Sequence, residues 1–279
     1  MSQVSRDAVR TFELLGGRAR LRGAGPDMGT ASQALPQGAY TTLRTYGGRR
    51  VVRLGQHFRR LEESMALKGH PAGIDSAAAR RALGAAVAEC GHEESRVRLT
   101  FAPPRLFASV ESFAPLPPSA YVDGVASVTV SVHRENPHAK DTRFIAVAGQ
   151  AYRSLPAGIE EGLMVAEDGS LLEGLSSNFF ALLDGMLRTE RERVLLGVTR
   201  SLVLEVAAGV LPVEERAVTL DDLPALGECF LTSVSREVLP VVRIDGREVG
   251  EGRPGPATRE ITRRFADLVE REAETLVGI

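Results

Sequence analysis

The sequence predicts an α+β protein of two domains, and three features of the chain support that prediction. Runs rich in Val, Ile, Thr and Tyr, joined by short glycine turns, predict strands in both halves of the chain. Segments with apolar residues three or four positions apart predict helices. The stretch FAPLPPS at 113–119 holds three prolines in seven residues and can continue neither a sheet nor a helix. We therefore expect domains at 1–117 and 118–279.

The first domain is expected to mix strands and helices. Glycine pairs mark the turns of two hairpins. Phe58, Leu61 and Met65 share one face of the first expected helix, and Asp75 or Ser76 is suited to cap the second. In order, the expected elements are a hairpin at 11–23, a loop at 24–37, a hairpin at 38–54, helices at 57–68 and 76–90, and strands at 96–102 and 106–113.

The second domain is also expected to mix both kinds of element. Asp-Gly turns separate two pairs of its strands, and the last helix is amphipathic. We find no internal repeat and no low-complexity tract. In order, the expected elements are a strand at 126–133, a helix at 144–155, strands at 162–167 and 171–173, a hairpin at 178–189, a helix at 200–210, strands at 228–233 and 238–244, and a helix at 258–276.

Lysine is almost absent from this chain, which makes its two lysines informative. Of 34 cationic residues only Lys68 and Lys140 are lysines. Arginine cannot replace lysine where a side chain must lose its proton and attack a carbonyl. Lys68 ends a helical pattern, where a cation is ordinary. Lys140 follows the polar loop Asn136–Ala139 and is either a surface lysine or a Schiff-base nucleophile.

Three further positions carry polar groups at the ends of expected elements. Glu173 ends a short strand before a glycine, which is typical of a solvated turn residue as well as of a site. The step Gly197-Val198-Thr199 opens a helix, where free N–H groups suit a phosphate, although simple capping is the commoner reason. Hydroxyl groups follow in Thr232–Ser235. Each signal is weak by itself.

Composition excludes several classes of protein. The net charge of −2 and the pI of about 6.3 give no reason to expect a nucleic acid or an anionic membrane as partner. Cys90 and Cys229 are too few for a disulfide framework or a four-ligand zinc site, and we expect no metal. The first ten residues lack the apolar segment of a signal peptide, and no apolar run is long enough to span a membrane. We expect a cytoplasmic globular protein.

Taken together and in order, six segments resemble the class IV aminotransferases, the pyridoxal-phosphate (PLP) enzymes of fold type IV. That family includes branched-chain aminotransferases, D-amino-acid aminotransferases and aminodeoxychorismate lyases. The resemblance covers roughly residues 38–260. Its segments are GAYTTLRTYGG, HFRRLEES, the PHAK that ends in Lys140, EDGSLLEGLSSNFF, LLGVTRSLVLEVA and ECFLTSVSREVLPVVRIDG. The resemblance implies a two-domain fold with PLP in the cleft between the domains, and a homodimer.

The resemblance also implies roles for individual residues. Lys140 resembles the lysine that forms the Schiff base with PLP, and Glu173 resembles the carboxylate that pairs with the pyridine nitrogen. A carboxylate there keeps the nitrogen protonated, so the ring can accept electrons from the substrate. Arg60 resembles the phosphate-binding arginine, and Val198 with Thr199 resembles the helix start that holds the same phosphate. Asn178, in the Glu173 motif, is included among the expected cofactor contacts.

Three departures from the family pattern affect the expected site. The tyrosine that many branched-chain enzymes carry shortly after the lysine is replaced here by Phe144 or Ile145. Val234 stands where the family commonly has a threonine on the phosphate, so Ser233 or Ser235 is expected to take over that contact. Thr41 stands where members often carry a glutamate. PLP binding is still expected, but the particular substrate is not defined.

Candidate substrate contacts lie on the strands of the first domain. Tyr40 and Arg44 lie on the strand that, in the family this chain resembles, lines the mouth of the pocket, and Arg98 lies on a neighbouring strand. Side chains two or four positions apart share a strand face, so Tyr40 and Arg44 can point the same way. An arginine there could bind a substrate carboxylate bidentately, or it could be a structural ion-pair partner. His57, His133 and His138 show no ligand spacing and are interpreted as bystanders.

Two activities remain open at this point. The first is a PLP-dependent transaminase that moves an amino group between an amino acid, with branched-chain or other aliphatic ones expected, and a 2-oxo acid. The second is a PLP lyase such as aminodeoxychorismate lyase, which eliminates pyruvate. A family member without activity is a third reading, and the retention of Lys140 and Glu173 argues against it. The sequence decides neither the substrate nor L or D stereochemistry.

Overall fold

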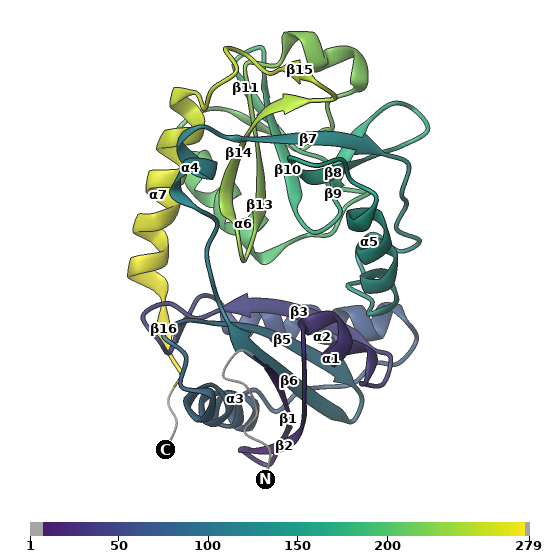
Figure 1. Cartoon of the computed structure of the whole chain (residues 1–279), viewed down its shortest axis with the longest axis vertical. Coiled ribbons are helices and arrows are strands. Elements are labelled where there is room, and N and C mark those ends of the chain that lie inside the picture. Colours follow the sequence, from purple (N-terminus) through teal and green to yellow (C-terminus); the bar gives the residue numbers. More distant parts are fainter. Residues whose placement is uncertain (1–7, 277–279) are drawn as a thin grey trace. The chain divides into compact units, whose positions relative to one another are not determined.

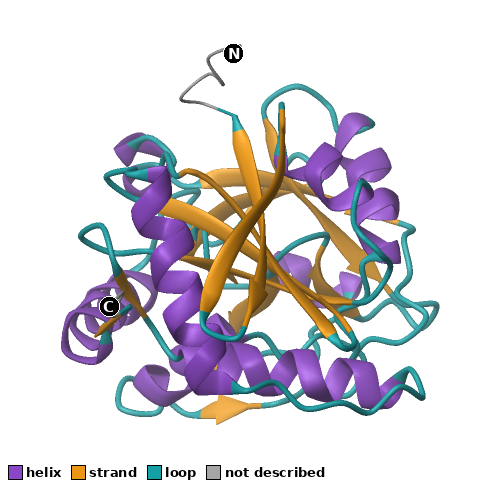
Figure 2. Cartoon of the chain, turned by 90° about the horizontal axis from the view of Figure 1, so that it is seen from below, coloured by secondary structure: helices purple, strands orange, loops and turns teal. Residues whose placement is uncertain are grey.

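The computed structural model describes residues 8–276, and contacts between Cα atoms group these residues into two units. Unit 1 comprises 8–114, 139–146 and 272–276. Unit 2 comprises 115–138 and 147–271. Among the described helices, none is both long and apolar enough to cross a bilayer. Both units mix helices and strands, which Figure 2 shows in purple and orange and which confirms the α+β class.

Unit 1 is built on an antiparallel five-stranded sheet with the order β2-β1-β6-β5-β3. Side chains alternate across its strands, so every second residue of β5 from Ser95 to Leu99 is buried. The expected turn at Gly16-Gly17 joins β1 to β2, and both glycines have positive φ, a conformation that glycine adopts at little cost. The strands are β1 (Val9–Leu15), β2 (Arg18–Gly25), β3 (Ala39–Arg44), β5 (Ser95–Ala102) and β6 (Arg105–Ser112).

Helices cover this sheet and close its core. The helix α2 (Leu54–Leu67) packs on β3, while α3 (Ser76–Cys90) packs on β1, β2 and β6 (Figure 1). The carboxylate of Asp75 accepts a hydrogen bond from the Ala78 N–H and caps α3, as its sequence predicts. The shared core includes Phe12, Leu43, Phe58, Leu61, Leu83, Val97, Leu99 and Phe101.

Two segments distant in sequence join unit 1. The strand β16 (Glu274–Thr275) pairs with β4 (Arg50–Val51) in a small antiparallel sheet. Residues 139–146 group with unit 1, because the backbone of this segment bonds to the start of β3. Our expected boundary at 117 lies three residues from the division after Ala114, but we expected Lys140 in the second domain, and its contacts place it in unit 1.

Unit 2 is built on a mixed sheet of nine strands. The order β10-β13-β14-β7-β8-β9 closes into a ring, since β9 also pairs with β10. The pairs β7–β8 and β14–β7 are parallel, and α5 (Arg143–Arg153) connects β7 to β8. The strands are β7 (Val125–Val130), β8 (Ile159–Val165), β9 (Leu171–Gly174), β10 (Asn178–Leu183), β11 (Met186–Arg188), β12 (Val213–Glu214), β13 (Glu228–Ser233), β14 (Glu237–Ile244) and β15 (Arg247–Glu248).

The core of unit 2 lies against this sheet. Phe180 and Phe230 stack with ring centroids 5.0 Å apart, and α6 packs on β13. Leu163, Phe179 and Leu231 belong to the main apolar cluster. The helices are α4 (Pro118–Val122), α6 (Val198–Ala207), the 3₁₀ helix η1 (Leu220–Ala225) and α7 (Pro256–Glu272).

Several elements differ from the sequence predictions. The helix α1 (Met28–Gln33), capped by Asp27, occupies the expected loop at 24–37. The helix α4 begins within the proline-rich stretch, because proline is tolerated in the first turn, where its missing N–H would have no helical partner. The last helix ends at Glu272 instead of 276, since the following residues pair as a strand. The strands β12 and β15 and the helix η1 were not predicted.

Candidate active site

The backbone of Lys140 is held on both sides by unit 1. Its carbonyl accepts a hydrogen bond from the Tyr40 N–H (2.8 Å), and its N–H donates to Ser64 Oγ on α2 (3.1 Å). Two residues further along, the Thr142 N–H donates to the Gly38 carbonyl (3.0 Å) and the Thr142 hydroxyl accepts from the Gly38 N–H (3.0 Å). The segment therefore extends the edge of β3, which fixes the point from which the Lys140 side chain starts.

The Tyr40 ring brings two cationic side chains together. Lys140 Nζ lies 4.8 Å from the ring centroid, and the Arg98 guanidinium carbon lies 5.3 Å from the same centroid. Both distances are within the range of cation–π attraction. Of the three predicted substrate contacts, Tyr40 and Arg98 are thus grouped with Lys140.

Arg98 has the environment of an anion-binding residue. One NH2 group donates to Ser32 Oγ (2.7 Å) and to the Met28 carbonyl (3.3 Å), and neither partner carries a charge. Burial lowers the pKa of Arg98, and its Nε is buried without a hydrogen-bond partner among residues 8–276. An arginine buried in this way without a salt bridge in the described chain can bind a carboxylate of a ligand.

Arg44 is placed differently. It forms an ion pair with Glu94 (2.8 Å), and its guanidinium carbon lies 4.4 Å from the Tyr46 ring centroid and 4.2 Å from that of Phe113. These contacts belong to the structural reading of Arg44 that the sequence left open. The prediction that it contacts substrate therefore has no support in its geometry.

A buried chain of hydrogen bonds reaches Arg60 on α2. An Arg60 NH2 group donates to Thr41 Oγ1 on β3, and Thr41 Oγ1 lies 2.7 Å from His57 Nδ1. All three residues are buried. His57 thus belongs to this buried hydrogen-bonded group, which its interpretation as a bystander did not anticipate. Its position, three residues after Leu54 and four before Leu61, places it on the buried face of the helix, a signal already present in the sequence.

Glu173 is a buried carboxylate with several donors in unit 2. Its Oε2 accepts from Asn178 Nδ2 (3.1 Å) and from the Leu195 N–H (3.2 Å), and its Oε1 accepts from Arg134 Nε (3.1 Å). Only 3% of the Glu173 side chain is exposed, so the reading of a solvated turn residue is wrong. Hydrogen bonds to the ionised form keep such a carboxylate charged. Sequence pattern gave no signal for Arg134.

Cross-strand pairing sets Glu173 in a row of polar side chains. Glu173 is opposite Asn178 in the β9–β10 pair, and Asn178 is opposite Thr232 in the β10–β13 pair. Directly opposite residues project from the same face of a sheet. The buried Oγ1 of Thr232 has no hydrogen-bond partner among the described residues. Such a hydroxyl next to Asn178 is available to a polar ligand.

The start of α6 approaches this row closely. A Cβ added at Gly197 would lie 2.4 Å from Asn178 Oδ1, so a larger residue would displace the Asn178 amide from its hydrogen bonds to Glu173 and Leu195. Gly197 supplies no side-chain cap, which leaves the first N–H groups of the helix, those of Val198 and Thr199, for another acceptor. Asn178 Nδ2 also donates to the Leu195 carbonyl (2.7 Å) and links this turn to Glu173.

The two serines predicted to contact the phosphate occupy the turn after β13. Ser233 Oγ accepts from the Arg236 N–H (3.2 Å), an ordinary turn contact. Ser235 is half-buried in the same turn. The structure does not distinguish between them as ligand contacts. Thr232, which sequence analysis grouped only loosely with them, has the unsatisfied hydroxyl instead.

A second polar cluster stabilises the turn that precedes Asn178. The fully buried carboxylate of Glu161 accepts from the Tyr152 hydroxyl (2.6 Å), Ser177 Oγ (2.8 Å) and an Arg236 NH2 group (2.7 Å). Burial raises the pKa of Tyr152, which therefore remains a hydrogen-bond donor at neutral pH. Because Glu161 is on β8 and Ser177 precedes Asn178, this cluster fixes the turn between β9 and β10.

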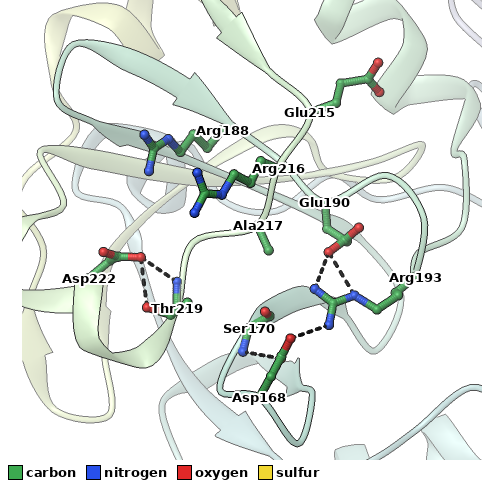
Figure 3. A pocket seen from close by; sticks show the side chains of 10 residues that line it. All are labelled: Asp168, Ser170, Arg188, Glu190, Arg193, Glu215, Arg216, Ala217, Thr219 and Asp222. Carbon is green, nitrogen blue, oxygen red and sulfur yellow. Dashed lines mark hydrogen bonds and ion pairs between the residues drawn. The ribbon is translucent and has the colours of Figure 1, made fainter.

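A separate pocket of unit 2, about 470 Å³ in volume, contains no residue of the predicted site (Figure 3). Arg193 donates to Glu190 (2.6 Å) and to Asp168 (2.9 Å) across this pocket. Asp222 accepts from the N–H and the hydroxyl of Thr219 and caps η1. The charged side chains that line this pocket thus pair mainly with one another, as in a structural ion-pair network.

Comparison with known proteins identifies the same family as the sequence motifs. Residues 38–244 match the family described as Amino-transferase class IV. This match covers well over half of the chain, so the chain belongs to the class IV aminotransferase family, as its motifs predicted.

Individual relatives agree with this assignment. A putative branched-chain-amino-acid aminotransferase of Methanocaldococcus jannaschii is 32% identical over 163 residues, which are 55% of this chain and 56% of that protein. The branched-chain-amino-acid aminotransferase of Pseudomonas aeruginosa is 36% identical over 124 residues, 43% of this chain and 40% of that protein. The matched stretch therefore spans about half the length of these relatives.

Solved structures extend the likeness over the whole fold. A putative branched-chain amino acid aminotransferase from Thermotoga maritima has a TM-score of 0.79 at 26% identity, covering 97% of this chain and 99% of that one. A branched-chain amino acid aminotransferase from T.th., solved with pyridoxamine 5′-phosphate, has a TM-score of 0.80 at 20% identity, with coverage of 97% and 99%. At that identity the second likeness concerns the fold alone, and it confirms the predicted fold type.

Proposed function

We propose that this protein is a PLP-dependent aminotransferase that moves an amino group between an aliphatic amino acid and a 2-oxo acid. Family membership over residues 38–244 is the observation that carries this proposal. The names of the relatives, which are branched-chain aminotransferases, support aliphatic donors. Because the same names favour transamination, we do not retain the lyase alternative.

The residues present fit the chemistry of this cofactor. Lys140 is assigned as the amine that binds it, since the other lysine, Lys68, is in an ion pair with Asp141 (2.9 Å). Glu173 is assigned to the ring nitrogen, where its charge would hold a proton. When bound, the cofactor supplies a ring that withdraws electrons from the substrate Cα. The Lys140 amine then serves as the base at that carbon.

A phosphate requires cationic and N–H donors, and the chain provides both. We assign the Arg60 guanidinium and the N–H groups of Val198 and Thr199 to the cofactor phosphate. The close approach of Gly197 to Asn178 and the uncapped start of α6 support this assignment. The unsatisfied hydroxyl of Thr232 supports a polar ligand beside Asn178, and Ser233 and Ser235 remain proposed contacts.

For the substrate carboxylate we propose Arg98 together with Tyr40. Both are grouped with Lys140, and Arg98 has no acidic partner in the described part of the chain. We do not propose Arg44 for this role, because its ion pair with Glu94 supports a structural one.

A half-reaction tests the proposed function directly. Purified protein loaded with PLP is mixed, one turnover at a time, with a panel of L- and D-amino acids, and conversion to pyridoxamine 5′-phosphate is followed by absorbance. We expect aliphatic donors to convert the cofactor and 2-oxo acids to reverse the change. Release of pyruvate from aminodeoxychorismate without that conversion would establish the lyase instead. No conversion with any donor would refute the aminotransferase.

Two further properties belong to the same proposal. We propose a homodimer, on family resemblance, and static light scattering of the holoprotein is the test, with a monomer as the contrary result. We propose a cytoplasmic location, supported by the free thiols of Cys90 and Cys229, because unpaired cysteines are usual in reducing compartments. Cell fractionation tests the location.

A further inference from the structure

The Thr41 hydroxyl lies between Arg60, which can only donate hydrogen bonds, and His57, whose ring nitrogen can donate or accept one. An Arg60 NH2 group donates to Thr41 Oγ1, because a guanidinium has no acceptor atom. Thr41 Oγ1 also lies 2.7 Å from His57 Nδ1. A hydroxyl has one hydrogen and two lone pairs. Thr41 Oγ1 therefore accepts from Arg60 and keeps one hydrogen and one lone pair, so it can pair with either tautomer of His57.

One of these two pairings leaves the ring of His57 neutral. If Thr41 donates to Nδ1, that nitrogen carries a lone pair, so the imidazole is neutral and bears its hydrogen on Nε2. Its surroundings agree, since burial and the charges of Arg60 and Lys140 lower the pKa of His57 well below its usual value. In that neutral state, one orientation of the Thr41 hydroxyl accepts from Arg60 and donates to His57.

From this arrangement we propose that Thr41 is a positioning residue for a phosphate-binding arginine. The Thr41 hydroxyl, oriented by His57, holds the guanidinium of Arg60 in one rotamer without placing a negative charge beside it. A neutral partner leaves the attraction of Arg60 for an anion undiminished, whereas a carboxylate in the same position would compete with that anion. The ligand class is a phosphate monoester. This inference rests on the proposed function, in which Arg60 contacts the cofactor phosphate.

The location of the three residues makes this role specific. Thr41 is fully buried on β3, and its strand neighbour Tyr40 donates its N–H to the Lys140 carbonyl and contacts the Lys140 ammonium through its ring. His57 and Arg60 are one turn apart on α2, so both reach the same hydroxyl. The sequence departs from its family at Thr41, and the geometry gives that departure a function.

The experiment compares two ligands that differ only in the phosphate. Apoprotein is titrated with pyridoxamine 5′-phosphate and with pyridoxamine, neither of which can form a covalent bond to Lys140, and the ratio of the two dissociation constants is measured. Thr41→Val keeps the shape of the side chain and removes the hydroxyl. We expect the ratio to fall about tenfold, as for the loss of a hydrogen bond to a charged group, while the affinity for pyridoxamine stays within about twofold.

Three controls separate positioning from folding. Because both ligands are measured on the same preparation, partial unfolding changes both affinities and leaves their ratio unchanged. Thr41→Ser restores the hydroxyl and should restore the ratio, and Thr41→Ala provides a second variant should valine disturb the packing. Adding Thr41→Val to Arg60→Met should change the ratio by less than about twofold, because Thr41 acts through Arg60.

The possible outcomes are distinct. A wild-type ratio near one would overturn both the phosphate site of the proposed function and this inference. A strong wild-type preference that Thr41→Val and Thr41→Ala leave unchanged would overturn the inference alone. A full tenfold effect that persists in the Arg60→Met background would overturn positioning through Arg60. The expected drop, with rescue by serine and loss of the effect without Arg60, supports it.

Discussion

The two lysines of the chain are joined through one residue: Lys68 Nζ lies 2.9 Å from Asp141 Oδ2, and Asp141 directly follows Lys140. Lys68 ends α2, so the ion pair attaches the lysine segment to that helix. Hydrogen bonds from Arg143 and Lys68 outweigh the effect of burial and lower the pKa of Asp141. Asp141 is therefore ionised at neutral pH and its contact with Lys68 is a full ion pair.

Lys68→Met should therefore lower the free energy of unfolding by about 1 kcal/mol, because the pair is partly shielded from solvent. Urea unfolding at neutral pH and low salt measures the change. Lys68→Arg keeps the charge and serves as the matched control, with an expected loss of less than half that amount. Equal stability of wild type and Lys68→Met would show that the pair contributes nothing.

Lys140→Arg should abolish covalent capture of PLP, since a guanidinium keeps its charge and cannot attack a carbonyl. Treatment of the holoprotein with borohydride followed by peptide mass mapping reads this out, and in the wild type the label should fall on Lys140. The half-reaction should be lost with it. A label on Lys68 in either protein contradicts the assignment.

Glu173→Gln should slow the half-reaction by about 10²–10³-fold, the usual cost of losing a pre-organised electrostatic partner. Glutamine keeps an oxygen that can accept from Asn178 Nδ2 and the Leu195 N–H, so PLP should still bind. Stopped-flow absorbance measures the rate, and PLP content measured on the same sample controls for binding. An unchanged rate would falsify the role of Glu173 at the ring nitrogen.

Arg98→Met should affect substrate binding, whereas Arg44→Met should affect stability. Loss of Arg98 should raise KM about tenfold or more, because it removes a charged contact to the substrate, with little change in unfolding temperature. Loss of Arg44 should lower stability by roughly 1–2 kcal/mol, because Glu94 and the rings of Tyr46 and Phe113 lose their partner, and should leave KM unchanged. Steady-state kinetics and thermal unfolding on both variants decide. The reverse pattern would exchange the two roles.

His57 should make the protein less stable as the pH falls below about 6.5, the ordinary pKa of histidine. In the folded state the pKa of His57 lies well below that value, so the unfolded chain binds a proton that the folded chain does not. The free energy of unfolding should then decrease by up to about 1.4 kcal/mol per pH unit. Comparing urea unfolding of wild type and His57→Gln between pH 5 and pH 8 isolates this slope. Parallel curves for the two proteins would mean that His57 binds a proton equally well in the folded and the unfolded chain.

Local signals in the chain were sufficient for much of the fold. Alternation and glycine turns predicted the strands of both units, and helical spacing at Phe58, Leu61 and Met65 predicted α2. These signals are short-range, because each depends on residues a few positions apart. The helix α1 was missed since its six residues are too few for a period to be recognised, and tertiary contacts stabilise it.

The sequence by itself determined the family, through six ordered motifs, and with it the identity of Lys140 and Glu173 as candidates. Only the tertiary structure decided which of Arg44 and Arg98 lacks an acidic partner among residues 8–276, that Thr41 hydrogen-bonds to both His57 and Arg60, and that the Lys140 segment packs with unit 1. The physical reason is that hydrogen bonds and ion pairs form between groups far apart in the chain. The Lys68–Asp141 pair joins residues more than seventy positions apart, and no local pattern records such a contact.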